Sequence, residues 1–533
     1  MGWIPLRNVT HYSLLKGFSK PDDIAKKCKE QGYQSCGIAD YRTVSGCIEF
    51  FKACKKNGIK PILGCDFGDF TLFAKNLKGW HNLMKLSSED ISTISISEYP
   101  DLIMVDNNGK HKDILPLSYY VNKEDAKLHR VLICSEFQTT LPKVTKEIRN
   151  GESKEYHKYF ITDKFCILDN DESTELCGKH KDQVSYIEQI DSLCEEYNIL
   201  NKPMLPRFDC PNNQTEEEYL TELNRQGWRN LLIKSGKVST EEAKKAYGDR
   251  FKEEFGIISG ANLCGYFLIV RDIIKYAEGN GWLCGPGRGS AAGCLISYLI
   301  GITKVDPVEF DLLFSRFYNA GRNTADNISL PDIDVDVPTE RRDQIIAYLK
   351  DKYGHDRVSQ MITFGRLQGK SAIKEVLRVN ESCSFAEMNA ISKAIPDESK
   401  ISDQLAEMDD EDRSIIKWAL IHNAKELQDY CRLTDDDKLE GEYAEAFEQA
   451  IKIEGTFKTQ GKHASGVVIS SKPLKEVCPI GKQKDSDENI VKLEMSDLDS
   501  IGLPKFDILG LSLLDKIMFI QELVKEQPEV FNG

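Results

Sequence analysis

Three aspartates that alternate with apolar residues are the first candidates for chemistry in this chain. They are Asp332, Asp334 and Asp336, within the run SLPDIDVDVPTE at residues 329–340. Successive side chains of a strand point to opposite faces, so these three carboxylates would share one face and repel one another. A bound divalent cation would relieve the repulsion, but a solvated strand face could also carry the charges. The pattern alone leaves both interpretations open.

A glycine-rich run comes shortly before the aspartates. GPGRGSAAG, residues 285–293, holds four glycines in nine positions, and we expect a helix after it. Such a loop lets backbone N–H groups approach an anion, and the start of the following helix adds positive potential. Arg288 and Ser290 would add a cation and a hydroxyl, which makes phosphate the natural ligand. A tight turn before a buried helix explains the glycines equally well.

Basic residues recur at every fourth position further along. Arg366, Lys370, Lys374 and Arg378 lie in FGRLQGKSAIKEVLRV, residues 364–379, with the single acid Glu375 among them. This spacing predicts one face of a helix. A charged run is often just a solvated face, but a stripe of one sign in a chain of net charge −15 favours contact with a phosphate backbone.

A third carboxylate is available from LPKFDILG, residues 503–510. Strand alternation places Lys505 and Asp507 on one face, and Phe506 and Ile508 on the other. His463, in the small-residue run GKHASGVVIS, is more readily explained as structural than as catalytic. Two or three carboxylates can hold two Mg²⁺ ions about 4 Å apart, as in-line phosphoryl displacement requires. The parts together predict nucleotidyl transfer.

The elements that would position these residues fall into blocks. Residues 1–210 alternate helical and strand-like pieces, which predicts an α/β layered or barrel-like domain, and residues 383–460 read as wholly helical and acidic. No apolar run is long enough to span a membrane. The sixteen cysteines include no CxxC pair, which favours a reducing cytoplasm over a disulfide framework or zinc ribbon. The tail from Leu511 reads as an amphipathic helix that stops at Pro528.

The order of the motifs resembles the C-family bacterial replicative DNA polymerases, the alpha subunit of DNA polymerase III. The matching runs are GYFLIV, GPGRGSAAG, LPDIDVDV, RDQIIAYLKDKYG, VSQMITFGRLQGKSAIKEVLRV, GKHASGVVIS and IGLPKFDILGL. The resemblance implies a multidomain α/β chain with a polymerase-and-histidinol-phosphatase (PHP)-like β/α barrel, a nucleotidyltransferase-type palm of mixed sheet and helices, and an inserted helical thumb. The implied divisions are PHP-like 1–212, first part of the palm 213–380, thumb 381–458, palm completion 459–515 and a C-terminal helix 516–533.

The resemblance also implies roles for individual residues. Carried over by position, the catalytic metal ligands are Asp332, Asp334 and Asp507; the incoming deoxynucleoside triphosphate is contacted by Arg288, Gly289, Ser290 and Lys505; and DNA is contacted by Arg366, Lys370, Lys374, Arg378 and His463. Asp336 lies outside the family's triad and is expected to support it. The implied cofactors and partners are two Mg²⁺ ions, deoxynucleoside triphosphates, primer-template DNA and replisome proteins.

The N-terminal third departs from the PHP pattern in LRNVTHYSLLKG and GIADYRT. Histidine positions of the family's metal site are held by Arg7, Val9 and Tyr41, and an acidic position is held by Lys16. His11 is displaced and only Asp40 is kept. Too few ligands remain for three metals, so we expect a structural, catalytically inactive PHP-like domain rather than a 3′–5′ exonuclease or other phosphoesterase.

The resemblance ends soon after Asp507, without a recognisable fingers domain. A second polypeptide that supplies the fingers is one expectation; a non-catalytic DNA-binding or replisome fragment is the alternative to a DNA-directed DNA polymerase. A bacterial cytoplasmic location follows from the family, with a phage-encoded origin also open.

Overall fold

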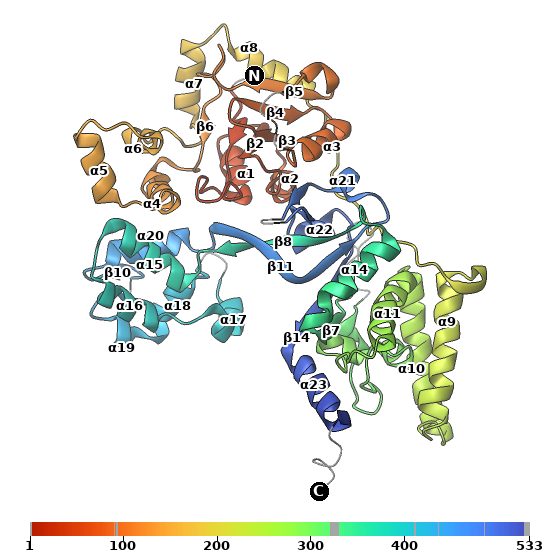
Figure 1. The fold of residues 1–533 in the computed structure, drawn as a ribbon. Helices are drawn as coiled ribbons and strands as arrows, with labels where there is room; N and C mark the ends of the chain where they lie inside the picture. Colours follow the sequence, from red (N-terminus) through yellow and green to blue (C-terminus); the bar gives the residue numbers. More distant parts are fainter. Residues whose placement is uncertain are drawn as a thin grey trace. The chain divides into compact units, whose positions relative to one another are not determined.

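The computed structural model describes residues 3–89, 91, 94–319, 330–409, 412–434, 436–483 and 486–526. The chain forms two compact units. The first unit contains residues 1–198 and 364–461, and the second contains residues 199–363 and 462–533 (Figure 1). Each unit has its own apolar core. The chain crosses from one unit to the other after residue 198, and again within two long strands.

The first unit is built on a six-stranded mixed sheet in the order β5-β4-β3-β2-β1-β6. The strands are β1 (Arg7–Asn8), β2 (Ser35–Tyr41), β3 (Lys60–Asp66), β4 (Phe70–Ala74), β5 (Leu102–Asp106) and β6 (Leu117–Ser118). β1 pairs in parallel with β2 and β6, and β2 with β3, whereas β4 is antiparallel to β3 and β5. The predicted mixed α/β character is confirmed, and closure into a barrel stays a prediction.

Helices of the N-terminal part connect these strands and extend beyond them. They are α1 (Pro21–Glu30), α2 (Cys47–Asn57), α3 (Leu77–Leu86), α4 (Ala126–Glu136), α5 (Leu141–Arg149), α6 (Lys158–Ile161), α7 (Asn170–Lys179) and α8 (Val184–Leu193). Sequence signals explain their limits: α1 begins with Pro21 followed by two aspartates, and α2 is followed by Gly58, whose positive φ of 72° suits glycine.

Helices of residues 364–461 complete the first unit. They are α15 (Gly369–Asn380), α16 (Phe385–Ala394), α17 (Glu398–Glu407), α18 (Ile415–His422), α19 (Ala424–Leu427) and α20 (Ala444–Ile453). Ile373 and Val376 of α15 and Phe447 of α20 share one buried cluster with Val131 and Leu132 of α4. One core therefore joins these helices to the N-terminal residues.

Two predictions for this segment are wrong in part. Residues 383–460 are not wholly helical, because β9 (Arg432–Leu433) pairs antiparallel with β10 (Leu439–Glu440) and a long strand begins at Phe457. Strands of two residues are too short to leave a periodic signal. Arg366 does not lie on the helix with the other basic residues, because it ends a strand and the helix begins only at Gly369.

The second unit contains a mixed sheet in the order β12-β13-β8-β11-β14-β7. Its strands are β7 (Asp334–Pro338), β8 (Val358–Arg366), β11 (Phe457–Ile469), β12 (Ile480–Lys482), β13 (Asn489–Val491) and β14 (Lys505–Leu511). β14 is parallel to β7 and antiparallel to β11, and β13 is parallel to β8. β8 and β11 are the strands that carry the chain to and from the first unit.

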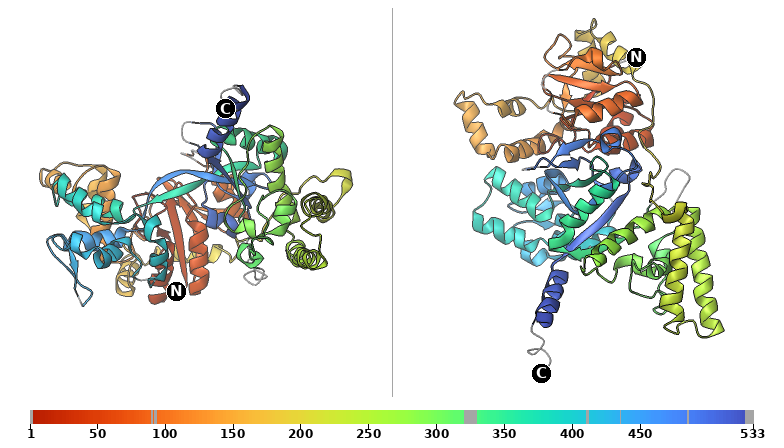
Figure 2. Two further views of the ribbon diagram at one scale, coloured as in Figure 1. Left: turned by 90° about the horizontal axis from the view of Figure 1, so that it is seen from below. Right: turned by 45° about the vertical axis from the view of Figure 1, so that its right-hand side comes forward.

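Helices pack on this sheet and beside it. They are α9 (Glu216–Gly227), α10 (Glu241–Gly260), α11 (Cys264–Gly279), α12 (Leu295–Leu299), α13 (Phe314–Phe317), α14 (Arg342–Tyr353), α21 (Leu474–Val477), α22 (Met495–Ser500) and α23 (Ser512–Glu526). Phe267 of α11 and Ile345 of α14 share a buried core with Val335 of β7 and Phe506 of β14. α9 and α10 lie side by side in every view (Figures 1 and 2).

α23 continues directly from β14, as the predicted C-terminal helix (Figure 1). The predicted stop at Pro528 lies outside the described residues. Within the described part of the chain, no single helix has the length and apolar composition of a membrane span. Among the helices that the structure describes, only the pair α10 and α11, bent by 106°, passes that test when the two helices are taken together.

Candidate metal and nucleotide site

Three aspartates meet at one edge of the second unit's sheet. β7 and β14 are parallel and in a register that places Asp334 beside Asp507, and Asp332 lies just before β7. One carboxylate oxygen from each of the three lies within 4.8 Å of the others. Asp507 is buried, Asp334 is half-buried and Asp332 is exposed, so the group opens to solvent on one side.

Strand alternation holds these carboxylates in place. Ile333 and Val335 beside the acids, and Phe506 and Ile508 on β14, are buried in the core beneath the sheet. Tyr266 of α11 stacks on Phe506 with ring centroids 5.2 Å apart, and its hydroxyl accepts a hydrogen bond from the Ile333 N–H at 3.4 Å. The apolar face therefore fixes the strands, and the acidic face is left for a ligand.

Lys505 lies among the carboxylates. Its ammonium donates to Asp507 Oδ2 at 2.7 Å and to Asp332 Oδ1 at 3.3 Å. Burial opposes the charged form of Lys505, but the hydrogen bond to Asp507 and the charges of both aspartates outweigh it and raise the pKa of the ammonium. Lys505 is therefore a fixed cation at this site.

Asp336 lies outside the group of three and contacts Arg288. Arg288 Nε is 3.2 Å from Asp336 Oδ1 and 3.5 Å from Asp334 Oδ2. Burial raises the pKa of Asp334; Arg288 partly offsets this rise, and the charges of the neighbouring carboxylates add to it. The backbone N–H of Gly285 donates to the Asp336 carbonyl at 3.0 Å, which ties the glycine-rich loop to β7.

The glycine-rich loop presents exposed residues, but the helix expected after it differs from the prediction. Arg288, Gly289 and Ser290 are exposed, and a 3₁₀ turn, Gly289–Gly293, precedes the five-residue α12. The α12 amide of Ile296 donates to Glu254 Oε2 at 3.1 Å. The start of α12 is thus already satisfied by a buried carboxylate, so any anion would depend on the loop itself and on Arg288.

A residue that the sequence did not indicate supports Asp507. Ser465 Oγ of β11 donates to Asp507 Oδ1 at 3.1 Å. His463 Nδ1 accepts the backbone N–H of Gly466 at 2.9 Å and lies 3.4 Å from Ser465 Oγ. His463 therefore shapes the backbone next to Ser465, and only the tertiary pairing of β11 with β14 could have revealed this link.

The basic residues of α15 belong to the first unit. Lys370 pairs with Asp397 at 2.6 Å, and Arg378 pairs with Glu375. Lys374 is half-buried, and its ammonium has no hydrogen bond or ion pair within the described part of the chain. Two of the three charges on the helical stripe are thus already balanced by carboxylates.

Asp40, the one ligand kept from the PHP pattern, is fully engaged by its own chain. It accepts hydrogen bonds from Thr10 N at 2.7 Å, Thr10 Oγ1 at 2.6 Å and Ser13 Oγ at 2.7 Å. Burial raises the pKa of Asp40 to about 6, although these hydrogen bonds act in the opposite direction. The carboxylate therefore organises the loop after β1.

The other residues at which the N-terminal part departs from the expected PHP pattern also form internal contacts. Buried Arg7 pairs with Asp66 at 3.3 Å, and the Lys16 ammonium lies 4.5 Å from the centre of the Tyr41 ring. His11 stacks on Phe457 with ring centroids 4.0 Å apart. Burial lowers the pKa of His11 to about 3, so this ring is neutral near pH 7.

The residues around Asp507 fit a divalent cation. Carboxylate oxygens are the ligands that Mg²⁺ prefers, and three of them converge here with solvent access. Counting Asp332, Asp334, Asp336 and Asp507 against Lys505 and Arg288 gives four negative and two positive charges, a balance of two negative charges. One divalent cation would neutralise that balance.

Two family descriptions match the chain. Residues 218–510 match the family described as the bacterial DNA polymerase III alpha NTPase domain, and residues 5–167 match the PHP domain. The first match covers more than half of the chain and includes all three clustered aspartates.

Curated relatives agree with these matches. Proteins named DNA polymerase III subunit alpha are 28% identical in Aquifex aeolicus, 30% in Borreliella burgdorferi and 28% in Escherichia coli strain K12. Each alignment covers 98% of this chain and, in the same order, 52%, 49% and 49% of the relative. The chain therefore spans about half the length of these relatives.

Proposed function

Because the chain belongs to the bacterial DNA polymerase III alpha family, we propose that its second unit carries a site for template-directed, metal-dependent nucleotidyl transfer in DNA synthesis. The substrates would be a deoxynucleoside triphosphate and primer-template DNA. Asp332, Asp334 and Asp507 are the proposed metal ligands, and the sheet that bears them is the proposed palm.

The observation that carries this proposal is the meeting of the three aspartates. They come from two segments separated by more than 170 positions, yet the parallel register of β7 and β14 brings their oxygens within 4.8 Å. Carboxylates so close together cost free energy unless cations balance them. A solvated strand face has no need of such a group, so the geometry favours the metal-site interpretation of the acidic run.

Neighbouring residues of this chain would hold the metal ligands and the phosphate-binding cations in position. Ser465 and Lys505 orient Asp507 through contacts of 3.1 and 2.7 Å, and Asp336 keeps Arg288 beside Asp334. Arg288 and Lys505 would bind phosphate oxygens of the triphosphate, and the exposed residues Gly289 and Ser290, which follow Arg288, would contribute backbone amides. A bound Mg²⁺ would supply charge neutralisation and an activated oxygen for the phosphoryl displacement.

Charge explains how two metal ions could share this site. The chain alone balances one divalent cation, as counted above. A second Mg²⁺ would need the negative charge that the triphosphate brings, which is how Mg²⁺ sites of this kind are usually completed. We therefore expect one ion to bind the protein alone and the second to bind with the nucleotide.

The remaining family assignments extend the proposal to the first unit. Residues 381–458 are the proposed thumb, and Arg366, Lys370, Lys374 and Arg378 are proposed DNA contacts, with His463 in the palm. Lys374 is the strongest candidate for a DNA contact on α15, because Lys370 and Arg378 already pair with acidic side chains. Phosphate contacts of this type would weaken uniformly with salt.

For the PHP-like domain we propose a structural role. The saturated hydrogen bonding of Asp40 and the ion pair of Arg7 with Asp66 support it, because both use polar groups that a metal centre would need. Metal-dependent 3′–5′ degradation of DNA that survives Asp332→Asn but is lost in Asp40→Ala would overturn this role.

Primer extension tests the central proposal. The chain would be incubated with a primed template, deoxynucleoside triphosphates and Mg²⁺, in parallel with Asp332→Asn and the control Asp343→Asn. Asp343 is 91% exposed on α14 and lies outside the acidic group. We expect extension that falls by at least about a hundredfold in Asp332→Asn and is unchanged in the control. Intact DNA binding with no extension would instead support a non-catalytic DNA-binding fragment.

A further inference from the structure

An apolar groove lies between two helical segments of the second unit, and the proposed transfer site does not use it. One wall is the end of α9 together with η5 (Trp228–Ile233), a π-helical turn that continues α9, and the other wall is the middle of α10. The groove has a volume of about 410 Å³, within the range of about 300–1,000 Å³ typical of ligand sites. π-Helical turns are rare and are frequently found at functional sites.

The groove lies on the face of α10 that is turned away from the glycine-rich loop. Arg250 of α10 donates to the carbonyl of Gly293 in that loop at 2.7 Å. Gly248 and Lys252, which line the groove, are each two residues from Arg250. Two residues turn a helix by about 200°, so they lie on the opposite face. α10 therefore separates the groove from the loop of the proposed transfer site.

The apolar walls of the groove are fixed by the core behind them. Trp228 and Phe251 are half-buried, and the Trp228 ring packs edge-on against the rings of Tyr247 and Phe251, with centroids 6.5 Å apart in both pairs. Tyr247 belongs to a buried cluster against which Trp228 and Phe251 pack. Ile233 is 56% exposed and adds a free aliphatic surface at the end of η5. The groove is thus preformed and open to an apolar side chain.

A glycine keeps the floor of the groove open. Gly248 lies within α10, where glycine costs about 0.5–1 kcal/mol relative to alanine. A Cβ built at this position would meet no atom within 4 Å, so the neighbouring side chains do not require a glycine here. The missing side chain leaves room that a ligand can fill.

Three cations border the groove from both walls. Arg225 and Arg229 come from the α9 side and Lys252 comes from α10, and all three are exposed. None of their charged groups has a hydrogen bond or ion pair within the part of the chain that the structure describes. Asp249 and Glu253, the acids next to Lys252 on α10, do not line the groove. In a chain of net charge −15, this rim is a local surplus of positive charge.

A buried amide adds an unsatisfied acceptor to the lining. Asn224 is 1% exposed, and its Nδ2 donates to the Leu220 carbonyl at 2.8 Å. Its Oδ1 has no hydrogen-bond donor among the described residues. A buried acceptor without a donor costs free energy, so a ligand that brings an N–H group would be favoured here.

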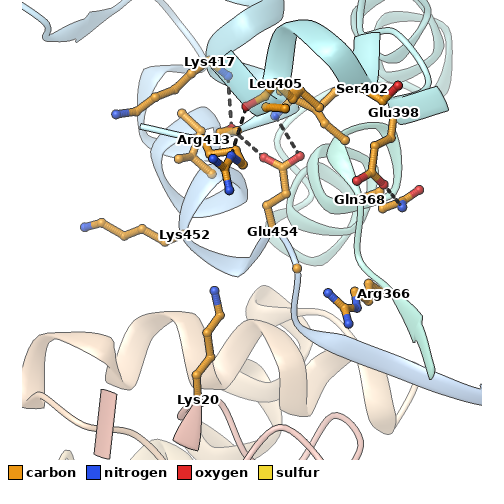
Figure 3. A pocket seen from close by; sticks show the side chains of 15 residues that line it. Lys20, Arg366, Gln368, Glu398, Ser402, Leu405, Arg413, Lys417, Lys452 and Glu454 are labelled. Atoms are coloured by element: carbon orange, nitrogen blue, oxygen red, sulfur yellow. Dashed lines mark hydrogen bonds between the residues drawn. The ribbon is translucent and has the colours of Figure 1, made fainter. Parts of the chain in front are cut away.

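A cavity of the first unit, shown in Figure 3, also has a basic lining, but most of its charges are already engaged. Lys417 pairs with Asp412, and Lys452 pairs with Glu448 at 2.8 Å. The Arg413 guanidinium donates to two backbone carbonyls at 3.0 and 3.2 Å. An acidic ligand would therefore gain more from the groove of the second unit.

The chemistry of the groove favours a protein segment over a nucleic-acid strand. Single strands are bound on aromatic rings whose faces are open to successive bases. Here the two aromatic side chains are half-buried and lie edge-on to each other, and the most exposed apolar side chain of the lining is the aliphatic Ile233. A segment with apolar anchors suits a groove between helices, and acidic residues beside the anchors would complement the rim.

We propose that this groove binds an acidic segment of a partner protein. One or two large apolar side chains of the segment would fill the space above Gly248. Carboxylates on either side would pair with Arg225 and Arg229 on one wall and with Lys252 on the other. The inference does not rest on the proposed function.

Selection from a displayed library of random linear peptides tests this proposal. The full chain would be the target, and the enriched peptides would be synthesised, labelled and titrated by fluorescence polarisation. Wild type would be compared with Gly248→Leu, which fills the groove, and with Ile233→Ser, Arg229→Glu and Arg229→Lys. Ile233 and Arg229 are exposed, so these variants test the proposal even if Gly248→Leu lowers stability.

Two variants outside the lining are the matched controls. Gly256→Leu lies on the same helix as Gly248 and also places its new side chain in open space. Arg316→Glu reverses the charge of an exposed arginine of α13.

We expect the enriched peptides to carry leucine or aromatic residues flanked by aspartate or glutamate. Their dissociation constants should rise about tenfold in Gly248→Leu and in Arg229→Glu, and about fivefold in Ile233→Ser. Arg229→Lys and both controls should retain the wild-type affinity. Added salt should weaken binding to the wild type more than binding to Arg229→Glu.

Four results would overturn the proposal. The first is a selection that enriches no peptide. The second is enrichment of peptides that are not acidic, or that bind Gly248→Leu or Arg229→Glu as tightly as the wild type. The third is binding of an oligothymidine that is lost in Gly248→Leu, which would make the groove a strand-binding site. The fourth is self-association of the wild type that Gly248→Leu abolishes, which would make a second copy of the chain the occupant.

Discussion

Replacing Lys505 with methionine should destabilise the acidic edge of the sheet in a way that a metal ion can repair. Lys505 and Asp507 have only 12% and 8% of their side chains exposed and lie 2.7 Å apart. Methionine keeps the length and apolar stem of lysine but removes the charge. Asp507 would then be a buried carboxylate whose only remaining hydrogen-bond donor in the described structure is Ser465.

The size of the effect follows from this burial. Breaking a buried ion pair by removing one partner typically costs 3–5 kcal/mol. The second contact of Lys505, to Asp332, adds little because Asp332 is 62% exposed. We therefore expect the Lys505→Met change to lower the local free energy of unfolding by about 3 kcal/mol. In the variant, the balance of two negative charges becomes three, so a divalent cation should restore more stability than in the wild type.

Hydrogen exchange of the peptide that covers β14 measures this directly. In EDTA, exchange in Lys505→Met should be about a hundredfold faster than in wild type, as about 3 kcal/mol implies. Added Mg²⁺ should slow it by a larger factor in the variant than in the wild type. Lys516→Met, an exposed lysine of α23, is the matched control. Unchanged exchange in EDTA, or equal protection by Mg²⁺ in both proteins, would refute the reasoning.

Three further expectations concern the buried acid, the buried histidine and one glycine. Burial raises the pKa of Asp40 from 3.8 to about 6. The stability that this carboxyl contributes is therefore complete below pH 3.8 and is lost as pH rises through 6, so the free energy of unfolding in urea should fall by about 3 kcal/mol over this interval. Asp40→Asn should abolish this fall. Burial lowers the pKa of His11 from 6.5 to about 3, so the free energy of unfolding should fall by about 1.4 kcal/mol per pH unit as pH drops through this interval, and His11→Phe should remove that fall. If the stability of Asp40→Asn or His11→Phe depended on pH as in the wild type, the pKa shift assigned to the replaced residue would be contradicted. Gly285→Ala would place a Cβ 2.8 Å from Asp336 Cβ and should lower the free energy of unfolding in urea by about 1–3 kcal/mol. The control Gly256→Ala, whose new Cβ on α10 would meet open space, should be neutral or stabilising. Equal stability of the two variants would contradict the close approach of Gly285 to Asp336.

Local sequence patterns were sufficient for the two strands that carry Asp334 and Asp507, but Asp332, which was expected in the same strand as Asp334, lies just before it. The alternation around Asp334 and Asp507 predicted strands with one acidic and one apolar face, and both segments are strands with buried Val335 and Phe506. This succeeds because the period of two in a strand is a local property that tertiary packing then exploits. Which strands pair, and in which register, is not local, so the contact of Asp334 with Asp507 rested on the family resemblance.

The residues that the sequence did not indicate are those defined by tertiary contact. Ser465 reaches Asp507 only because β11 pairs with β14, and Glu254 satisfies the start of α12 from a distant helix. Arg366 fits the four-residue spacing of the helix but belongs to a strand, because spacing alone cannot locate the point at which a strand ends. The core shared by α4 and α15 could not be predicted either, because an apolar helical face indicates that the face is buried but does not indicate which element packs against it.

Binding of Mn²⁺, as a spectroscopic substitute for Mg²⁺, is the measurement that tests the central claim most directly. Electron paramagnetic resonance would count bound ions in the wild type, Asp507→Asn and the exposed control Asp343→Asn, with and without a deoxynucleoside triphosphate. We expect one ion per chain without nucleotide and two with it in the wild type and the control, and loss of the nucleotide-independent ion in Asp507→Asn. Equal binding by Asp507→Asn and the wild type would contradict the assignment of the three aspartates as the metal site.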